Sequence, residues 1–186
     1  MSKTPKRAYA APTILKPFDK NDRSIVQVVI ETPKGSRNKY KFEPNLSSFK
    51  LSKVLPDGMV FPYDFGFVPS TQAADGDPID VLLLIDEPAF PGCVIESRLI
   101  GVIEGEQAEE GATERNDRLV AVATENHTYS RLNDLSQLNP KLVEEISQFF
   151  VNYHELQGSK FKVLGVRGAK QAARLLKKAI RKNKAA

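Results

Sequence analysis

The 186-residue sequence has few of the side chains that build disulfides and zinc sites. Its one cysteine, Cys93, excludes an internal disulfide and agrees with a reducing compartment. His127 and His154 are the only histidines, so a structural zinc site, which takes about four Cys or His ligands, is disfavoured.

No apolar stretch reaches the roughly 20 residues that a spanning helix needs. Residues 1–15 also lack the apolar core of a signal peptide. We therefore expect a cytoplasmic protein that does not bind membranes.

Positive charge is concentrated at one end of the chain. The net charge is +4, but residues 167–186 contain eight basic side chains and no acidic one. The remainder carries 19 of the basic residues against all 23 acidic residues. The tail is thus a basic C-terminal helix, for which nucleic-acid binding is one interpretation and a solvated helix face the favoured one.

The pattern of elements predicts an α+β fold that is mainly β. The length suits one domain over residues 1–186, with residues 1–22 as an extended arm. Asn139 and Pro140 predict a helix start, and Gly158 can end that helix. Many short strands followed by helices indicate a closed or nearly closed barrel with helices outside it. β-Branched or alternating runs predict strands at 24–32, 38–43, 49–55, 80–85, 94–104, 118–124 and 161–166, with an aromatic loop at 61–67 and a polar loop at 105–116.

The most informative segment is acidic. Asp75, Asp77 and Asp80 fall within six residues and are followed directly by the apolar run 81–85. Carboxylates this close repel one another unless a cation lies among them. Mg²⁺ takes oxygen ligands and is usually held by a few carboxylates, water and substrate phosphates. The apolar run predicts a buried strand, so Asp80 should stand at a rigid edge.

Two alternatives compete with a magnesium site. A short acidic run is often a solvated turn. A calcium-binding EF-hand loop is the other rival, and it needs a ligand at its fifth position and glycine at its sixth. Counted from Asp75, those positions hold Ile79 and Asp80, so the sequence fails the EF-hand pattern. A phosphate-handling Mg²⁺ site fits the segment best.

The segment 75–81 resembles the signature of the soluble, Mg²⁺-dependent inorganic pyrophosphatases of the single-domain type. The order of elements agrees from about Ser24 to Val166. The resemblance implies an OB-like, five-stranded β-barrel with flanking helices and a homo-oligomer, with a hexamer favoured. Further matching segments are 29–33, 39–40, 61–66, 91–95, 99–102 and the helix that carries Phe149, Phe150 and Tyr153.

The resemblance also implies a reaction and a set of roles. Diphosphate would be hydrolysed to two phosphates by a metal-activated water, with Mg²⁺ as the cofactor. Asp75, Asp80 and Asp117 would hold the first metal ions, and Glu31 a further one that arrives with the substrate. Asp77 would be the catalytic residue that orients the water or takes its proton, and it would also be a metal ligand. The substrate-binding side chains implied are Lys39, Lys53, Tyr153, Arg118, Lys41 and His154.

Several positions depart from the family pattern on the substrate side. Lys41 stands where the family usually has Glu, which reverses a charge. Lys53 replaces an Arg and loses its bidentate fork. Phe61 and Phe65 stand for two tyrosines, and His154 for a lysine.

The acidic loop that normally carries an Asp and an Asp-x-Lys run is longer in this chain. We assign Asp117 and Arg118 to that run, with the register open by one or more residues.

Three functions therefore stay open. The first is an inorganic diphosphatase, and the second is a hydrolase of the same fold with another phosphoanhydride substrate. The third is an OB-like module that binds nucleic acid through the basic tail. The third is disfavoured because the aspartate cluster would repel a phosphodiester backbone.

Overall fold

The computed structural model describes residues 11–109 and 111–180. Residues 1–10 of the expected arm and 181–186 of the expected basic helix lie outside the described residues. Within the arm, Phe18 forms a β-bridge to Val26. The elements are η1 (Pro12–Ile14), β1 (Ile25–Thr32), β2 (Asn38–Glu43), η2 (Pro44–Leu46), β3 (Ser48–Val54), β4 (Asp64–Phe67), β5 (Asp80–Leu84), β6 (Val94–Glu109), β7 (Ala112–Arg115), β8 (Arg118–Ala123), η3 (Leu135–Gln137), α1 (Pro140–Glu155), β9 (Lys160–Gly168) and α2 (Ala169–Ala179).

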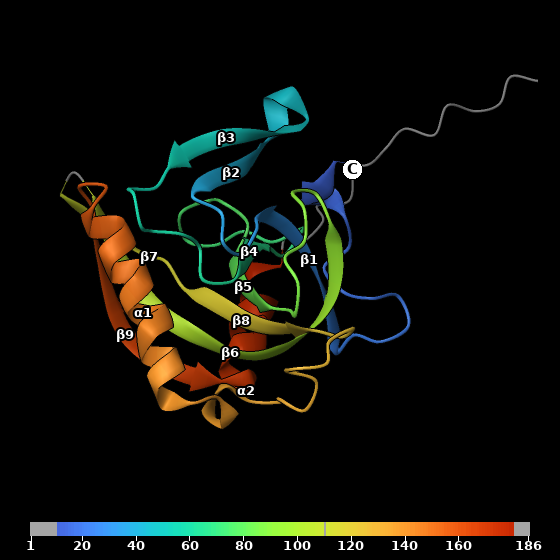
Figure 1. Cartoon of the computed structure of the whole chain (residues 1–186). Coiled ribbons are helices and arrows are strands. Elements are labelled where there is room, and N and C mark those ends of the chain that lie inside the picture. Colours follow the sequence, from blue (N-terminus) through green and yellow to red (C-terminus); the bar gives the residue numbers. More distant parts are fainter. Residues whose placement is uncertain (1–10, 110, 181–186) are drawn as a thin grey trace, which may run out of the picture.

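The strands form one ring and one separate hairpin (Figure 1). β1 pairs with β4, β4 with β5, β5 with β8, β8 with β6, and β6 again with β1, which closes the ring. Every pairing in the ring is antiparallel except β5 with β8, which is parallel. β7 and β9 extend the sheet from β6, whereas β2 and β3 form a two-stranded sheet of their own. The predicted fold class, α+β and mainly β, is confirmed.

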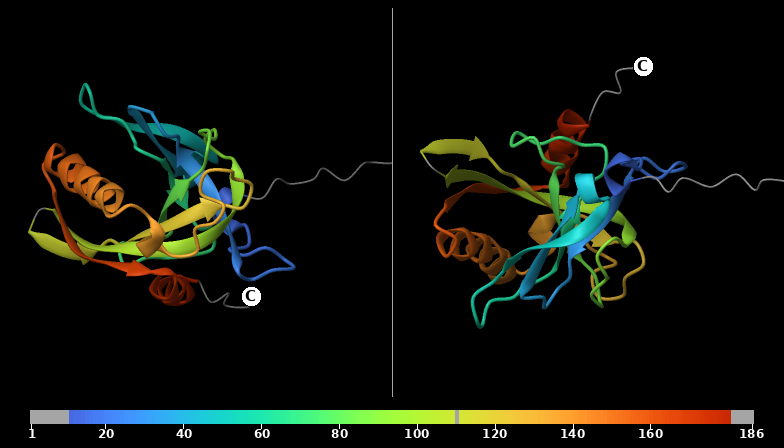
Figure 2. Two further views of the ribbon diagram at one scale, coloured as in Figure 1. Left: turned by 60° about the horizontal axis from the view of Figure 1, so that its bottom comes forward. Right: turned by 90° about the horizontal axis from the view of Figure 1, so that it is seen from above.

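The ring is buried on both faces, which explains its continuous apolar strands. Alternate residues of β5 point to opposite faces: Leu82 and Leu84 join a core with α1, and Val81 and Leu83 join a core with α2. Figure 2 shows α1 and α2 on two sides of the long ribbon formed by β6 and β9. Residues in the ring are therefore held from two directions.

The helix start at Asn139 is confirmed. The Asn139 side chain accepts a hydrogen bond of 2.9 Å from the backbone N–H of Lys141, as an N-cap does. α2 ends at Ala179, and Ile180 forms a bridge to Thr71 instead of continuing the helix. In the described residues no helix is long and apolar enough to cross a membrane.

Two predicted loops are strands instead. The polar loop at 105–116 is a β-hairpin, in which β6 continues to Glu109 and pairs with β7 on one side and β9 on the other. Backbone pairing, rather than an apolar pattern, holds these polar residues extended. The aromatic loop at 61–67 contains β4, where Gly66 allows close approach of β1. A Cβ on Gly66 would lie 1.9 Å from the Val29 carbonyl oxygen.

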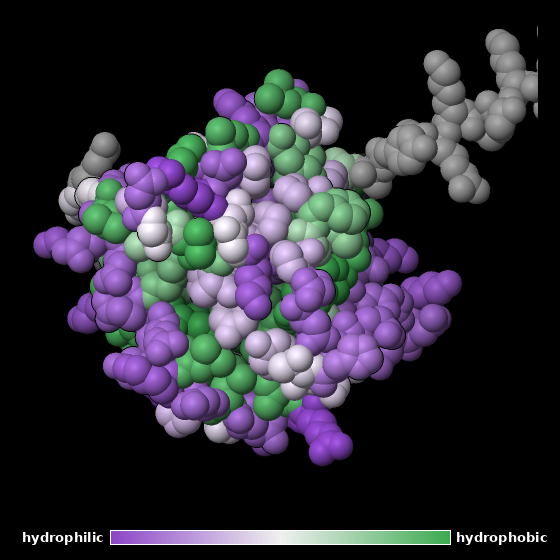
Figure 3. Space-filling model, in the orientation of Figure 1, coloured by the Kyte–Doolittle hydropathy of each residue, from purple (hydrophilic) through white to green (hydrophobic). Residues whose placement is uncertain are grey.

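The β2–β3 hairpin is less deeply anchored than the ring. β3 has no buried residue, and Phe42 of β2 joins a small apolar cluster with Val29 and Phe67. Leu51 and Val54 stay about half exposed. Apolar residues consequently reach the surface over this hairpin, at the top of the view in Figure 3.

Candidate active site

A cavity of about 700 Å³ lies between the β2–β3 hairpin, the start of β5, the β6–β7 hairpin and the end of α1. It has carboxylates and cations in its wall, a combination that suits a polyanion accompanied by metal ions. The lining carboxylates are Glu31, Glu43, Asp75, Asp77, Asp80, Glu109 and Glu114, and the cations are Lys39, Lys41, Lys53 and Arg118.

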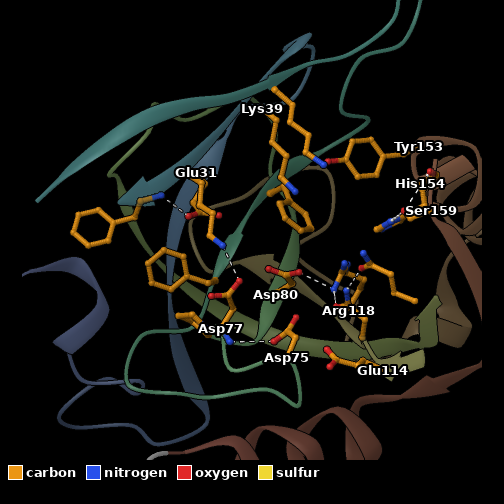
Figure 4. Close-up of a pocket in the computed structure, with 18 of the residues that line it drawn as sticks. Glu31, Lys39, Asp75, Asp77, Asp80, Glu114, Arg118, Tyr153, His154 and Ser159 are labelled. Carbon is orange, nitrogen blue, oxygen red and sulfur yellow. Dashed lines mark hydrogen bonds and ion pairs between the residues drawn. The ribbon is translucent and has the colours of Figure 1, made fainter. Parts of the chain in front are cut away.

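The three aspartates of the signature meet in this cavity. Figure 4 shows Asp75, Asp77 and Asp80 together, with Glu31 above them in that view. The Asp75 carboxylate accepts a hydrogen bond of 3.1 Å from the backbone N–H of Asp77, which fixes the turn. Burial raises the pKa of Asp75 above its ordinary value, although this hydrogen bond acts in the opposite direction.

Two of these aspartates already contact a cation of the chain itself. Lys41 Nζ lies 2.7 Å from Asp77 Oδ2, and Arg118 Nη1 lies 2.7 Å from Asp80 Oδ2. In residues 11–109 and 111–180, no three Asp, Glu, His or Cys side chains already converge as a metal cage. The oxygen donors nevertheless suit a hard divalent cation, because Asp75 has no ion pair among these residues and each paired aspartate has a second oxygen.

Arg118 is the most firmly held cation of the site. Its guanidinium lies 5.6 to 5.9 Å from the ring centroids of Phe65, Phe150 and Phe161. Nη1 donates to Asn116 Oδ1 as well as to Asp80. Nε is buried and has no hydrogen-bond partner among the described residues, so a donor remains for a ligand or a water.

The structure does not bring Asp117 into the site. Its carboxylate accepts from Arg115 Nε at 2.8 Å and from the Gly105 backbone N–H at 3.1 Å, and it does not line the cavity. Asn116 lines the cavity instead. Asp117 lies just before β8, and these two hydrogen bonds hold its carboxylate outside the cavity, whereas Arg118, the first residue of β8, lines the cavity. Of the two residues before Arg118, the amide Asn116 lines the cavity and the carboxylate Asp117 does not.

Glu31 is buried at the end of β1. Its Oε1 accepts a hydrogen bond of 2.7 Å from the Phe42 backbone N–H, which links the ring to the hairpin. Burial raises the pKa of Glu31 to about 7, against the lowering effect of that hydrogen bond. A cation near Glu31 would favour its ionised form.

The predicted phosphate-binding lysines also point into the cavity. Lys39 Nζ lies 5.2 Å from the Tyr153 ring centroid and 5.6 Å from that of Phe65. Lys53 Nζ donates to Gln157 Oε1 at 2.6 Å. These two lysines and Tyr153 thus form the wall opposite the aspartates.

His154 is buried and neutral. Burial, with the charges of Arg118, Lys39 and Lys53, lowers its pKa to about 3. Its Nδ1 lies 3.1 Å from Ser159 Oγ, and its ring stacks on Phe161. Nε2 is buried without a partner in the described residues. His154 therefore offers a hydrogen bond to a ligand, but no positive charge.

The lining also includes polar residues to which the sequence pattern assigned no role, among them Asn116, Glu114, Gln157 and Ser159. Asn116 could have been found, because it lies two residues before Arg118, as the first residue of an Asp-x-Lys run does. Gln157 and Ser159 follow α1 in an irregular turn, where no periodic pattern marks the side that a residue faces.

This geometry defines a protein with a closed ring of β-strands and a cavity that is lined by both carboxylates and cations. The family model for "Inorganic pyrophosphatase" matches residues 28–184. An inorganic pyrophosphatase from Nostoc sp. is 38% identical over 157 residues, which cover 84% of this chain and 90% of that protein. One from Halalkalibacterium halodurans is 37% identical over 152 residues, or 82% of this chain and 91% of that protein.

A solved structure gives the same result. The crystal structure of inorganic pyrophosphatase from Thermus thermophilus superposes with a TM-score of 0.84 at 36% identity, and the match covers 92% of this chain and 97% of that one. The chain belongs to the inorganic pyrophosphatase family, and membership implies a divalent-metal cofactor.

Proposed function

We propose that the protein hydrolyses diphosphate to two phosphates with Mg²⁺ as its cofactor. The observation that carries this proposal is the shared cavity, in which Asp75, Asp77 and Asp80 face Lys39 and other cations. Diphosphate is a compact polyanion, so it needs cations around its oxygens, and the cations need carboxylates to hold them. Family membership supports the same reaction.

Each side chain has a role in this proposal. Asp75, Asp80, Asp77 and Glu31 would hold Mg²⁺, which supplies charge neutralisation and an activated water. Asp77 would orient that water and accept its proton, after Lys41 leaves the carboxylate.

The opposite wall would bind the substrate. Lys39 and Lys53, together with Arg118 beside Asp80, would contact phosphoryl oxygens and stabilise the charge that develops on the leaving phosphate. The hydroxyl of Tyr153 and the ring of His154 would add hydrogen bonds.

The test is phosphate release from diphosphate in the presence of Mg²⁺. The Asp77→Asn variant should lose most of the activity, because the amide cannot accept the proton of the water. Asp57→Asn is the control, since Asp57 is exposed and lies outside the cavity. An unaffected rate in Asp77→Asn would refute the role of Asp77, and absence of release by the wild-type protein would refute the function.

A hydrolase for another phosphoanhydride is the second candidate. It is favoured by the chemistry of the substrate wall, where Lys53 is no bidentate donor and His154 carries no charge. Nucleoside triphosphates and polyphosphate should therefore be assayed beside diphosphate. Turnover of one of these alone would select this candidate, and salt-dependent oligonucleotide binding without hydrolysis would select a nucleic-acid-binding module.

We also propose a cytoplasmic homo-oligomer. The single cysteine supports a reducing compartment, and the resemblance to bacterial relatives favours a hexamer. Light scattering on the purified full chain measures the oligomer size. A monomer at micromolar concentration would contradict the proposal.

A further inference from the structure

The pairing of Asp77 with Lys41 bears on metal binding, and the inference drawn from it rests on the proposed function. The two residues come from different parts of the fold: Lys41 lies on β2 of the separate hairpin, and Asp77 lies in the turn before β5. Their contact of 2.7 Å lies in the cavity wall, and both side chains are about half exposed. A carboxylate oxygen that accepts from an ammonium has less negative charge to offer a second cation.

The two cations that contact aspartates differ in freedom. Arg118 is buried, lies against three aromatic rings and binds Asn116 as well as Asp80. Lys41 is about half exposed, and its ammonium contacts Asp77 alone among the described residues. A lysine ammonium stands on a flexible four-carbon stem, so Lys41 can move away from Asp77 without disturbing the core. Arg118 is a fixed part of the wall, whereas Lys41 is removable.

The surrounding charges favour the ionised form of Lys41. Partial burial acts to lower its pKa, but the hydrogen bond to Asp77 and the charges of Glu31 and Asp80 outweigh it and raise the pKa above the ordinary value. Lys41 thus faces a group of carboxylates, Asp77, Glu31 and Asp80, that attracts cations. It supplies one positive charge at the position where a divalent ion would approach Asp77.

We propose that Lys41 is a built-in competitor of the divalent cation at Asp77, and that it weakens metal binding in the absence of substrate. An arriving polyanion would draw the ammonium toward its own oxygens and free the carboxylate. Metal would therefore bind more tightly at Asp77 together with the anion than alone. Lys41 therefore couples metal binding at Asp77 to binding of the anion.

The experiment is a Mn²⁺ titration of the metal-free full chain without any anion, followed by the electron paramagnetic resonance signal of free Mn²⁺. Lys41→Met keeps an unbranched side chain and removes the charge. Lys50→Met is the matched control, because Lys50 pairs with Lys41 across the same hairpin and does not line the cavity. We expect Lys41→Met to bind Mn²⁺ roughly ten-fold more tightly than the wild type. Lys50→Met should stay within about two-fold of the wild type.

Equal affinities in Lys41→Met and Lys50→Met would overturn the inference, as would weaker binding in Lys41→Met or no Mn²⁺ binding in any variant. Lys41→Gln repeats the test with a polar side chain if Lys41→Met unfolds. The diphosphate assay separates the two proposals. Active wild type with equal Mn²⁺ affinities would reject Lys41 as a competitor, but not the function. Inactive wild type with ten-fold tighter binding in Lys41→Met would reject only the function.

Discussion

The two walls of the cavity differ in how they are held. The carboxylate wall is built on β1, β5 and the turn before β5, and these two strands belong to the ring, where residues pack into cores on both faces. The cationic wall lies largely on the β2–β3 hairpin, a separate sheet whose outer strand has no buried residue. Side chains on the hairpin can change without disturbing a core. The departures at Lys41 and Lys53 fall on this hairpin, while Asp80 of β5 and the two aspartates of the turn before it fit the family signature.

The largest effect should come from the ring wall. Asp80→Asn removes a metal ligand and leaves the Arg118 guanidinium buried without its ion pair. We expect kcat/KM for diphosphate to fall about 10³-fold, equivalent to about 4 kcal/mol of transition-state stabilisation. Steady-state kinetics at saturating Mg²⁺ measures this, with Asp57→Asn as the control. A loss below about ten-fold would show that the ring wall contributes no more to catalysis than the hairpin wall.

Stability should show the same asymmetry. Leu82→Ala leaves a cavity in the core between β5 and α1, and we expect the free energy of unfolding to fall by about 3 kcal/mol. Leu51→Ala, on the half-exposed hairpin, should cost about 0.5 kcal/mol. Urea unfolding followed by circular dichroism compares the two. Similar costs would show that the hairpin is as firmly integrated as the ring.

His154 should make stability depend on pH. Its pKa is about 3 in the folded chain, below the ordinary value of 6.5, so the unfolded chain binds the proton more readily. The stabilisation is present above pH 6.5 and is lost progressively as the pH falls toward 3.

The wild type should therefore lose about 2 kcal/mol more than His154→Gln between pH 7.5 and pH 4.5. Unfolding curves at both pH values, recorded without metal, measure the difference. Parallel losses in both proteins would mean that His154 is not buried in its neutral form.

The smallest effect should come from the exposed lysine of the hairpin. Lys53 contacts Gln157 and is proposed to bind a phosphoryl oxygen. Lys53→Met should raise KM for diphosphate about five-fold, close to 1 kcal/mol, with kcat nearly unchanged. Lys50→Met controls for the loss of one hairpin charge. A change in kcat with a constant KM would place Lys53 in the chemical step instead.

The sequence predicted the strands of the ring better than it predicted the contacts between the two walls of the cavity. The apolar run after Asp80 marked β5 because both of its faces are buried, and Asn139 marked the start of α1. The sequence left the register at Asp117 open, because the polar residues between β7 and β8 show no pattern that marks the side each one faces. The hairpin of β6 and β7 was missed because its polar residues are held by backbone pairing. The contact of Lys41 with Asp77 joins the hairpin to the turn before β5, and a contact between residues so far apart in the sequence has no local pattern.

The single parallel pairing in the ring has a consequence for folding. Asp80 and Arg118 are the first residues of β5 and β8, and they lie opposite each other because these two strands run parallel. β6 and β7 lie between these two residues in the chain, so the contact joins residues that are far apart in the sequence. Contacts of this kind slow folding, because the entropy of closing a long segment is lost before the contact stabilises the chain. We therefore expect the Asp80–Arg118 pair to assemble after local elements such as α1 and the β2–β3 hairpin.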